Sequence, residues 1–292
     1  MIGYKAASYR GLRDGLVNIA RQTWSRASDD NIGLIAAGVA FYSFLAMIPL
    51  MAATILIYSL VADPPAISAH LRAIAGHLPG EAARLVEQQL TSVVQTSSSK
   101  KGVGLLVSLA IALFGARKGA GSLMTGLNIT FACKEDRGFI AQNLTGIAIT
   151  IGFAVMAVLV VIAIATLGAL GELWPAGPPA VISLGKLSAN LVLAAAIAGG
   201  AALLFRFGPA CRKAPLKWLS PGSVLTAAGM VLLTIGFGFY VANFGNYNAT
   251  YGSLGAVVVL LTWIWLSAYI LLLGGELTAT LLELEVAQDG SG

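Results

Sequence analysis

Glu276 is the residue of this sequence best placed to do chemistry. It lies near the end of an apolar run, Tyr251 to Leu284, with no other charge before it. The ~25 preceding residues, at ~1.5 Å each, are enough to cross a hydrocarbon layer of ~30 Å. An ionisable group within or at the edge of a membrane span is costly, so it normally faces a partner, a cavity or the interface. The partner of Glu276 is therefore the first question.

Helical spacing places polar residues on one face of this last span, with Glu276 at its cytoplasmic margin. Counted along their helices, charged residues of two earlier segments reach a similar depth. We therefore predict a cytoplasmic-side charge cluster, made of Asp29 or Asp30, Arg117 or Lys118, and Glu276. The full set of candidates for this cluster or for a polar pathway is Asp29, Asp30, Arg117, Lys118, Asn128, Trp265, Tyr269, Glu276 and Thr280.

Two interpretations of this cluster are open. Charges of opposite sign can form a structural clasp, because helices commonly neutralise unavoidable charges by pairing them. The same groups can instead line a pathway for an ion or a lipid headgroup. Arg117 alone can also extend its charge to the phosphates of the inner leaflet. Replacing Glu276 by Gln would impair transport by a pathway, but only the folding yield of a clasp.

Enzyme motifs are missing from the sequence. His70 and His77 are seven residues apart with no third ligand nearby, so we interpret them as solvated or packed. The glycine-rich stretch Gly115 to Gly121 contains a lysine but lacks the Gly-Lys-Ser/Thr order of a phosphate-binding loop. Packing of helices through small residues explains it better. We expect no catalytic residue, no metal site and no cofactor.

The composition is that of a polytopic membrane protein. Hydrophobic residues make up 57% of the chain and charged residues only 11%, against about 25% in soluble domains. The mean hydropathy is +0.82. The net charge of +5 comes from basic residues in short segments between apolar runs, which indicates membrane orientation and not a nucleic-acid partner.

The apolar runs predict an all-α fold with six transmembrane helices. The predicted spans are about 32–61, 103–130, 139–170, 187–207, 221–241 and 251–284. A segment 1–31 precedes them, a helical insert 63–102 follows the first span on the outer side, and a tail 285–292 ends the chain. Of the 18 Lys and Arg residues, 13 fall on one side, in the N-terminal segment, in two loops and in the halves of the spans that adjoin these loops. Both termini are therefore predicted to be cytoplasmic.

Four local features lead to further predictions. The basic N-terminal segment 1–31 reads as an amphipathic helix on the inner membrane surface, in contact with anionic lipid, or else as a tethered tail. Pro49 interrupts the first span as a hinge or a static kink. Small-residue faces permit homo-oligomers. Cys133 and Cys211 both fall in predicted cytoplasmic segments, so free thiols are expected.

Several stretches together resemble the YihY/virulence factor BrkB family. They are Asp29 to Pro49, Phe114 to Asn128, Leu204 to Pro215 with Pro221-Gly222, and Tyr251 to Leu254 through Trp263 to Gly274-Gly275-Glu276-Leu277. The resemblance covers nearly the whole chain and implies a bacterial inner-membrane protein with six spans. Gly275 departs from the alanine more common in that family. Its old ribonuclease BN label fits poorly with a chain lacking a nuclease-type metal site.

Two functions follow as hypotheses. One is a transporter-like protein that moves a lipid or a small solute, with polar residues of the second and sixth spans along the route. The other is a non-transporting envelope scaffold, whose outer insert and basic N-terminal segment bind partners or anionic lipid.

Overall fold

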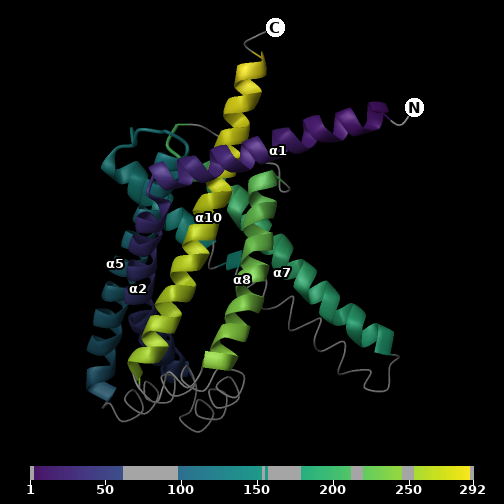
Figure 1. The fold of residues 1–292 in the computed structure, drawn as a ribbon. Helices are drawn as coiled ribbons and strands as arrows, with labels where there is room; N and C mark the ends of the chain where they lie inside the picture. Colours follow the sequence, from purple (N-terminus) through teal and green to yellow (C-terminus); the bar gives the residue numbers. More distant parts are fainter. Residues whose placement is uncertain are drawn as a thin grey trace. The chain divides into compact units, whose positions relative to one another are not determined.

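The computed structural model describes residues 3–61, 98–152, 155–156, 179–211, 220–244 and 253–289, and these residues contain helices and no strand (Figure 1). The helices are α1 (Gly3–Asp29), α2 (Ile32–Val61), α5 (Ser98–Thr130), the unlabelled helix Phe139–Gly152, α7 (Pro179–Phe207), α8 (Pro221–Phe244) and α10 (Ser253–Asp289). The prediction of an all-α polytopic membrane fold is confirmed.

Three of the described helices are long and apolar enough to cross a membrane: Leu106–Thr130 within α5, Pro221–Tyr240 within α8, and Val257–Val286 within α10. A fourth is obtained if α1 and α2 count as one span broken by a bend of 61°. Large apolar side chains are exposed along these helices, as expected where lipid replaces water as the solvent. The count of six spans stays a prediction.

The bend between α1 and α2 is made by Asn31. Its φ of 52° lies in the left-handed region, which Asn tolerates better than most residues. The amide of Leu34 donates to the Asn31 carbonyl at 2.9 Å and starts α2, while the Asn31 side chain donates to the Asp29 carbonyl at 3.1 Å. The predicted start of the first span near Asp29 and Asp30 thus becomes a sharp corner that ends α1.

The chain forms two compact units. Unit 1 comprises residues 1–37, 120–236 and 266–292, and unit 2 comprises residues 38–119 and 237–265. In unit 1, residues from four helices and the turn after α5 are fully buried, among them Ile32, Leu127, Phe131, Phe205 and Leu272. The rings of Phe131 and Phe205 lie 6.4 Å apart between centroids. This apolar core joins the start of α2 to α5, α7 and α10.

In unit 1, glycines let α8 and α10 approach each other closely. A Cβ added at Gly222 would overlap the carbonyl of Gly274, and one at Gly274 would come within 2.6 Å of the Gly222 carbonyl. Thr226 and Thr278 each donate a side-chain hydrogen bond of 2.9 Å to those carbonyls, Thr226 to Gly222 and Thr278 to Gly274. Small residues therefore let the two backbones meet, as is common in membrane helices.

In unit 2, the glycine-rich stretch packs α5 against α2. A Cβ at Gly115 would lie 2.7 Å from that of Ala46, and one at Gly119 would lie 3.5 Å from the Ser43 hydroxyl. These contacts support the interpretation of the stretch as a packing surface. Pro49 lies inside α2, which is continuous from Ile32 to Val61, and its role as hinge or kink stays a prediction.

The expectation of free thiols is wrong. Cys133, in the turn after α5, forms a disulfide with Cys211 at the end of α7, with their Cα atoms 5.5 Å apart. The two cysteines are 78 residues apart in sequence, so their spacing carried no signal of pairing. The hydrogen bond of 2.7 Å from the Ala210 amide to the Asn128 side chain brings the two segments together.

Candidate functional site

Glu276 lies at the centre of a polar cluster in unit 1. Its side chain has 0% exposure, and no charged residue precedes it in α10. Before it come Gly274 and Gly275, and the space beside them is occupied by Phe205 and Thr130. The sequence Gly-Gly-Glu thus lets neighbouring helices close over the carboxylate. Such a group requires compensation, because a buried charge is costly unless it is paired and hydrogen-bonded.

The basic partner of Glu276 is Arg26, from the last turn of α1. Its Nε lies 3.3 Å from Oε2 of Glu276, and its Nη1 lies 2.6 Å from Oε2 of Glu283. Nη2 donates to the carbonyl of Thr130 at 3.1 Å. One guanidinium therefore joins α1, α5 and α10, a use for which its fork of donors is suited. Figure 1 shows α1 (purple) crossing α10 (yellow) where these contacts form.

Two further groups approach the Glu276 carboxyl: the carboxyl of Asp30 and the hydroxyl of Thr130. Neither provides a well-formed hydrogen bond to Oε1 of Glu276, which is buried without a partner. The hydroxyls of Thr130 and Thr280 are also buried without a partner. Thr280 follows Glu276 by one helical turn, on the same face of α10. The cluster is therefore charged and incompletely hydrogen-bonded.

The structure brings together only some of the predicted candidates. Asp30, Glu276 and Thr280 belong to unit 1 and lie at the cluster, whereas the exposed Asp29 accepts a hydrogen bond of 3.4 Å from Ser25. Tyr269 also belongs to unit 1, and a Cβ at Gly33 would touch its ring at 3.8 Å.

Arg117, Lys118 and Trp265 belong to unit 2. Arg117 and Lys118 are exposed, and the Lys118 amine lies 5.8 Å from the centre of the Phe114 ring. Arg26 was missed as the partner of Glu276 because the N-terminal segment was assigned to the membrane surface. The available signal was its position, as the last base before the first span.

Asn128 belongs to a second polar network, at the disulfide. Its side chain donates to Glu135 at 2.7 Å and accepts from the Ala210 amide at 2.7 Å. Arg137 donates to both oxygens of Glu135, at 2.6 and 2.7 Å, and to the Gly208 carbonyl at 2.9 Å. The hydrogen bonds from Arg137, together with that from Asn128, lower the pKa of Glu135 from 4.5 to about 2. This network fastens the loops after α5 and α7.

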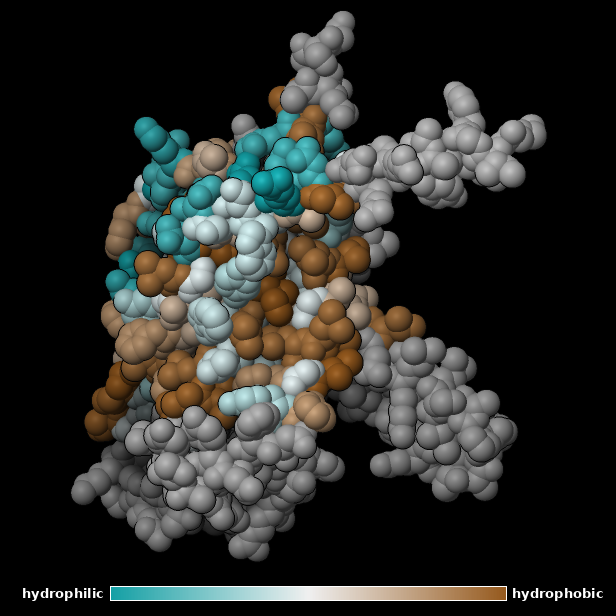
Figure 2. Space-filling view, viewed as in Figure 1, coloured by the Kyte–Doolittle hydropathy of each residue, from teal (hydrophilic) through white to brown (hydrophobic). Residues whose placement is uncertain are grey.

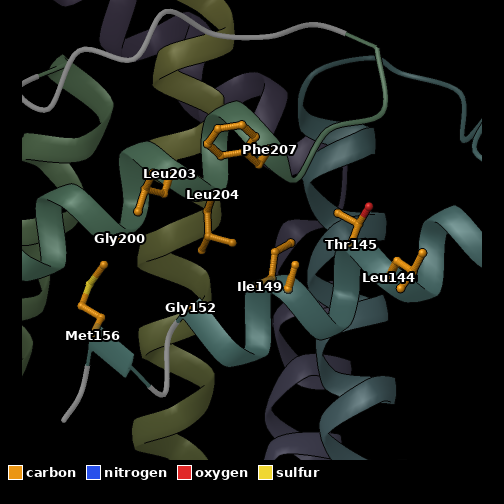
Figure 3. A pocket seen from close by; sticks show the side chains of 10 residues that line it. Leu144, Thr145, Ile149, Gly152, Met156, Gly200, Leu203, Leu204 and Phe207 are labelled. Atoms are coloured by element: carbon orange, nitrogen blue, oxygen red, sulfur yellow. The ribbon is translucent and has the colours of Figure 1, made fainter. Parts of the chain in front are cut away.

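An apolar cavity of about 500 Å³ opens between the helix Phe139–Gly152 and α7 (Figure 3). Its lining includes Leu144, Ile149, Leu203 and Phe207, and Thr145 is its one hydroxyl-bearing residue. The Thr145 hydroxyl donates to the Ala141 carbonyl at 2.9 Å, so it is occupied within its own helix. The volume is within the range of ligand pockets, about 300 to 1,000 Å³. Such a wall suits an acyl chain better than a polar solute.

Hydrophilic residues gather where α1 crosses α10, and hydrophobic residues dominate away from that end on the face seen in Figure 2. Within the part of the chain that the structure describes, no group of three or more His, Cys, Asp or Glu residues could hold a metal ion. His70 and His77, like the predicted insert 63–102 as far as residue 97, lie outside the described residues.

Comparisons with known proteins agree with the resemblance noted from the sequence. The profile of the family "Virulence factor BrkB" matches residues 23–291. The "Putative ribonuclease-like protein YfkH" of Bacillus subtilis (strain 168) is 31% identical over 263 residues, which cover 84% of this chain and 88% of that protein. No solved structure matches. The chain belongs to the Virulence factor BrkB family of membrane proteins.

Proposed function

We propose that this protein is a transporter-like protein of the bacterial inner membrane that moves a lipid or a small solute, and that Glu276 controls the route. The observation that carries the proposal is a carboxylate with 0% exposure on a membrane helix, with one oxygen left without a hydrogen-bond partner. Ionisable groups at such positions commonly mark pathways for substrates or ions.

The distances favour a pathway over a clasp. A clasp that stabilises the fold would hold the most buried acid most tightly, because that acid is the costliest to leave unpaired. Arg26 instead lies closer to Glu283, whose side chain is 42% exposed, than to the buried Glu276. The ion pair of Arg26 with Glu276 is thus weaker than that with Glu283. It can break while Arg26 stays paired with Glu283.

The apolar cavity supports a lipid as the cargo. Its lining of Leu, Ile, Met and Phe side chains accepts an acyl chain without leaving polar groups unpaired. Arg206 lies next to its wall, with the guanidinium 5.7 Å from the centre of the Phe207 ring. A cation beside a residue of the cavity wall would suit the headgroup of an anionic lipid.

Reconstitution into liposomes tests the proposal. The wild type is expected to accelerate movement of a lipid, solute or ion across the bilayer, and Glu276→Gln is expected to remove at least about 90% of that acceleration. Glu285→Gln is the matched control, because it removes an exposed carboxylate from the same helix. Equal activity of wild type and Glu276→Gln in all readouts would contradict the proposal.

The alternative function is a non-transporting envelope scaffold. It is favoured by the apolar residues that α1 exposes, since Leu16 is 67% and Trp24 63% exposed on a helix that carries several arginines. Such a surface binds anionic lipid or a partner helix. Binding of the protein to anionic vesicles without any transport would support this alternative.

We propose that the protein is not an enzyme, although the name of its relative suggests ribonuclease activity. The support is the sequence, whose two histidines are seven residues apart and whose glycine-rich stretch packs two helices. Purified protein is expected to leave single-stranded and transfer RNA intact with Mg²⁺, Mn²⁺ or Zn²⁺. Cleavage that copurifies with the wild type through two columns would contradict this.

A further inference from the structure

We infer that Asp30 and Glu276 form a proton-binding site, in which one proton is held between two carboxyl groups beside Arg26. The inference deepens the proposed function, because it names the proton as the ion that accompanies transport, and its role in transport rests on that function. The binding site itself rests on the cluster alone.

The charge of the cluster requires an additional positive charge. Arg26 contacts Glu276 and Glu283, and Asp30 approaches Glu276. With all four groups ionised, three negative charges would face one positive charge, a net of −2. Two carboxylates that share a site cannot both remain ionised without further compensation. Glu283 is partly exposed and water can solvate it. The negative charge that lacks compensation is therefore that of Asp30 and Glu276.

The unpaired atoms indicate where the proton resides. Oε2 of Glu276 already faces the Nε–H of Arg26 at 3.3 Å, so it must stay an acceptor. Oε1 has no partner, and neither does the buried hydroxyl of Thr130 that approaches the same carboxyl. A proton on Oε1 would become a donor toward Asp30 or the Thr130 hydroxyl. One proton therefore supplies the missing charge and the missing hydrogen bond together.

The proton can reach this site from the side of α1. Glu276 has 0% exposure, while Arg26 is 26% exposed and Asp30 is half-buried at the corner between α1 and α2. Of the two carboxyl groups that share the proton, Asp30 is therefore the more exposed and Glu276 the inner acceptor. The groups that face Glu276 are Arg26 and Asp30 at the end of α1 and Thr130 of α5, with Thr280 and Glu283 on the same face of α10.

Infrared difference spectroscopy of the full-length protein in liposomes tests the site directly. The spectrum of the wild type should contain a protonated-carboxyl band that disappears as the pH is raised. The band should be lost in Glu276→Gln. It should shift to a different pH in Asp30→Asn, and it should remain in Glu285→Gln, which removes an exposed acid of the same helix.

Folding is checked separately. If Glu276→Gln does not give a monodisperse protein in detergent, Thr130→Val provides the second variant. It removes the unpaired hydroxyl while keeping the shape of the side chain, and it should move the titration of the same band by at least about half a pH unit.

Absence of a titrating carboxyl band in folded wild-type protein would overturn the inference, and so would a band that persists unchanged in both Glu276→Gln and Asp30→Asn. Replacement of the pH effect by an equal effect of sodium at fixed pH would also overturn it. The measurement needs no transport. A titrating band in a protein without transport activity would therefore reject the proposed function and support the proton site. Transport without the band would support the proposed function and reject the proton site.

Discussion

At the scale of single residues, Arg26 is the side chain on which the candidate site most depends. It forms ion pairs with both Glu276 and Glu283, and it also donates a hydrogen bond to the Thr130 carbonyl. Removing one member of such a set leaves the others buried without compensation, which costs more than the intact set contributes. Substitutions at this position should therefore be more damaging than the loss of one surface charge.

We predict that Arg26→Gln lowers the free energy of unfolding by about 2 to 4 kcal/mol, less than the cost in a dry interior because Arg26 is partly exposed. Thermal unfolding in detergent measures this effect. Arg21→Gln is the control, because Arg21 is an exposed base on the same helix. Adding Glu276→Gln to Arg26→Gln should restore part of the lost stability. If Arg26→Gln and Arg21→Gln have the same stability, the ion pairs of Arg26 contribute nothing to the free energy of unfolding.

Glu135 gives a prediction about pH. Hydrogen bonds from Arg137 and Asn128 lower the pKa of Glu135 from 4.5 to about 2 in the folded state. The unfolded state then binds the proton more readily, so the stabilisation is fully present above pH 4.5 and is lost as the pH falls toward about 2.

The melting temperature of Glu135→Gln should accordingly lie below that of the wild type at neutral pH, by the equivalent of about 1 to 2 kcal/mol for charge-assisted hydrogen bonds that are partly exposed. The difference should shrink between pH 4.5 and about 2. Asp136→Asn, at an exposed neighbouring acid, serves as control. A difference in melting temperature that stays constant as the pH falls to about 2 would mean that Glu135 acts through its shape and not through its charge.

At the scale of elements, the position of Glu276 depends on two adjacent glycines with unequal surroundings. A Cβ at Gly274 would meet the backbone carbonyl of Gly222 at 2.6 Å, whereas one at Gly275 would meet the side chains of Thr130 and Phe205 at 3.2 and 3.5 Å. A backbone atom of a packed helix cannot move aside as a side chain can. The two positions therefore tolerate a methyl group very differently.

We predict that Gly274→Ala costs about 2 to 3 kcal/mol through overpacking between α8 and α10. Gly275→Ala should change stability by less than about 1 kcal/mol, because its neighbours can shift and alanine favours the helix. Denaturation of the two variants side by side in the same detergent checks the contrast. Equal losses would show that the crossing of α8 and α10 is not held by backbone contact.

The helices could be predicted from the sequence more readily than the contacts between them. An apolar run such as Ser253 to Glu283 is long enough to specify a helix by itself, since a membrane leaves backbone groups no other partner. The pairing of Arg26 with Glu276 joins residues 250 positions apart, and it exists because Asn31 turns α1 back across α10. The disulfide of Cys133 and Cys211 is similarly set by where two helices end.

At the scale of the whole molecule, orientation in the membrane decides how the cluster can work. The count of Lys and Arg predicts that residues 1–31, the loops around Lys134 and Arg212, and the C-terminal tail are cytoplasmic. The disulfide then lies on the same side, although disulfides are uncommon in a reducing cytoplasm. These two observations favour opposite orientations, and a direct measurement of sidedness separates them.

We expect both termini to be cytoplasmic, as the charge pattern predicts, because orientation follows the bias of Lys and Arg in short loops. In a variant with Cys133 and Cys211 replaced by alanine, a single cysteine at Ser291 should react with a membrane-impermeant maleimide only after the cells are opened. One at Ser97, in the predicted outer insert, should react in intact cells. The reverse pattern would place Arg26 and Glu276 toward the outside, where the proton site would face the acidic side of an energised membrane. The proposed direction of proton entry would then be inverted, while the site itself would be unchanged.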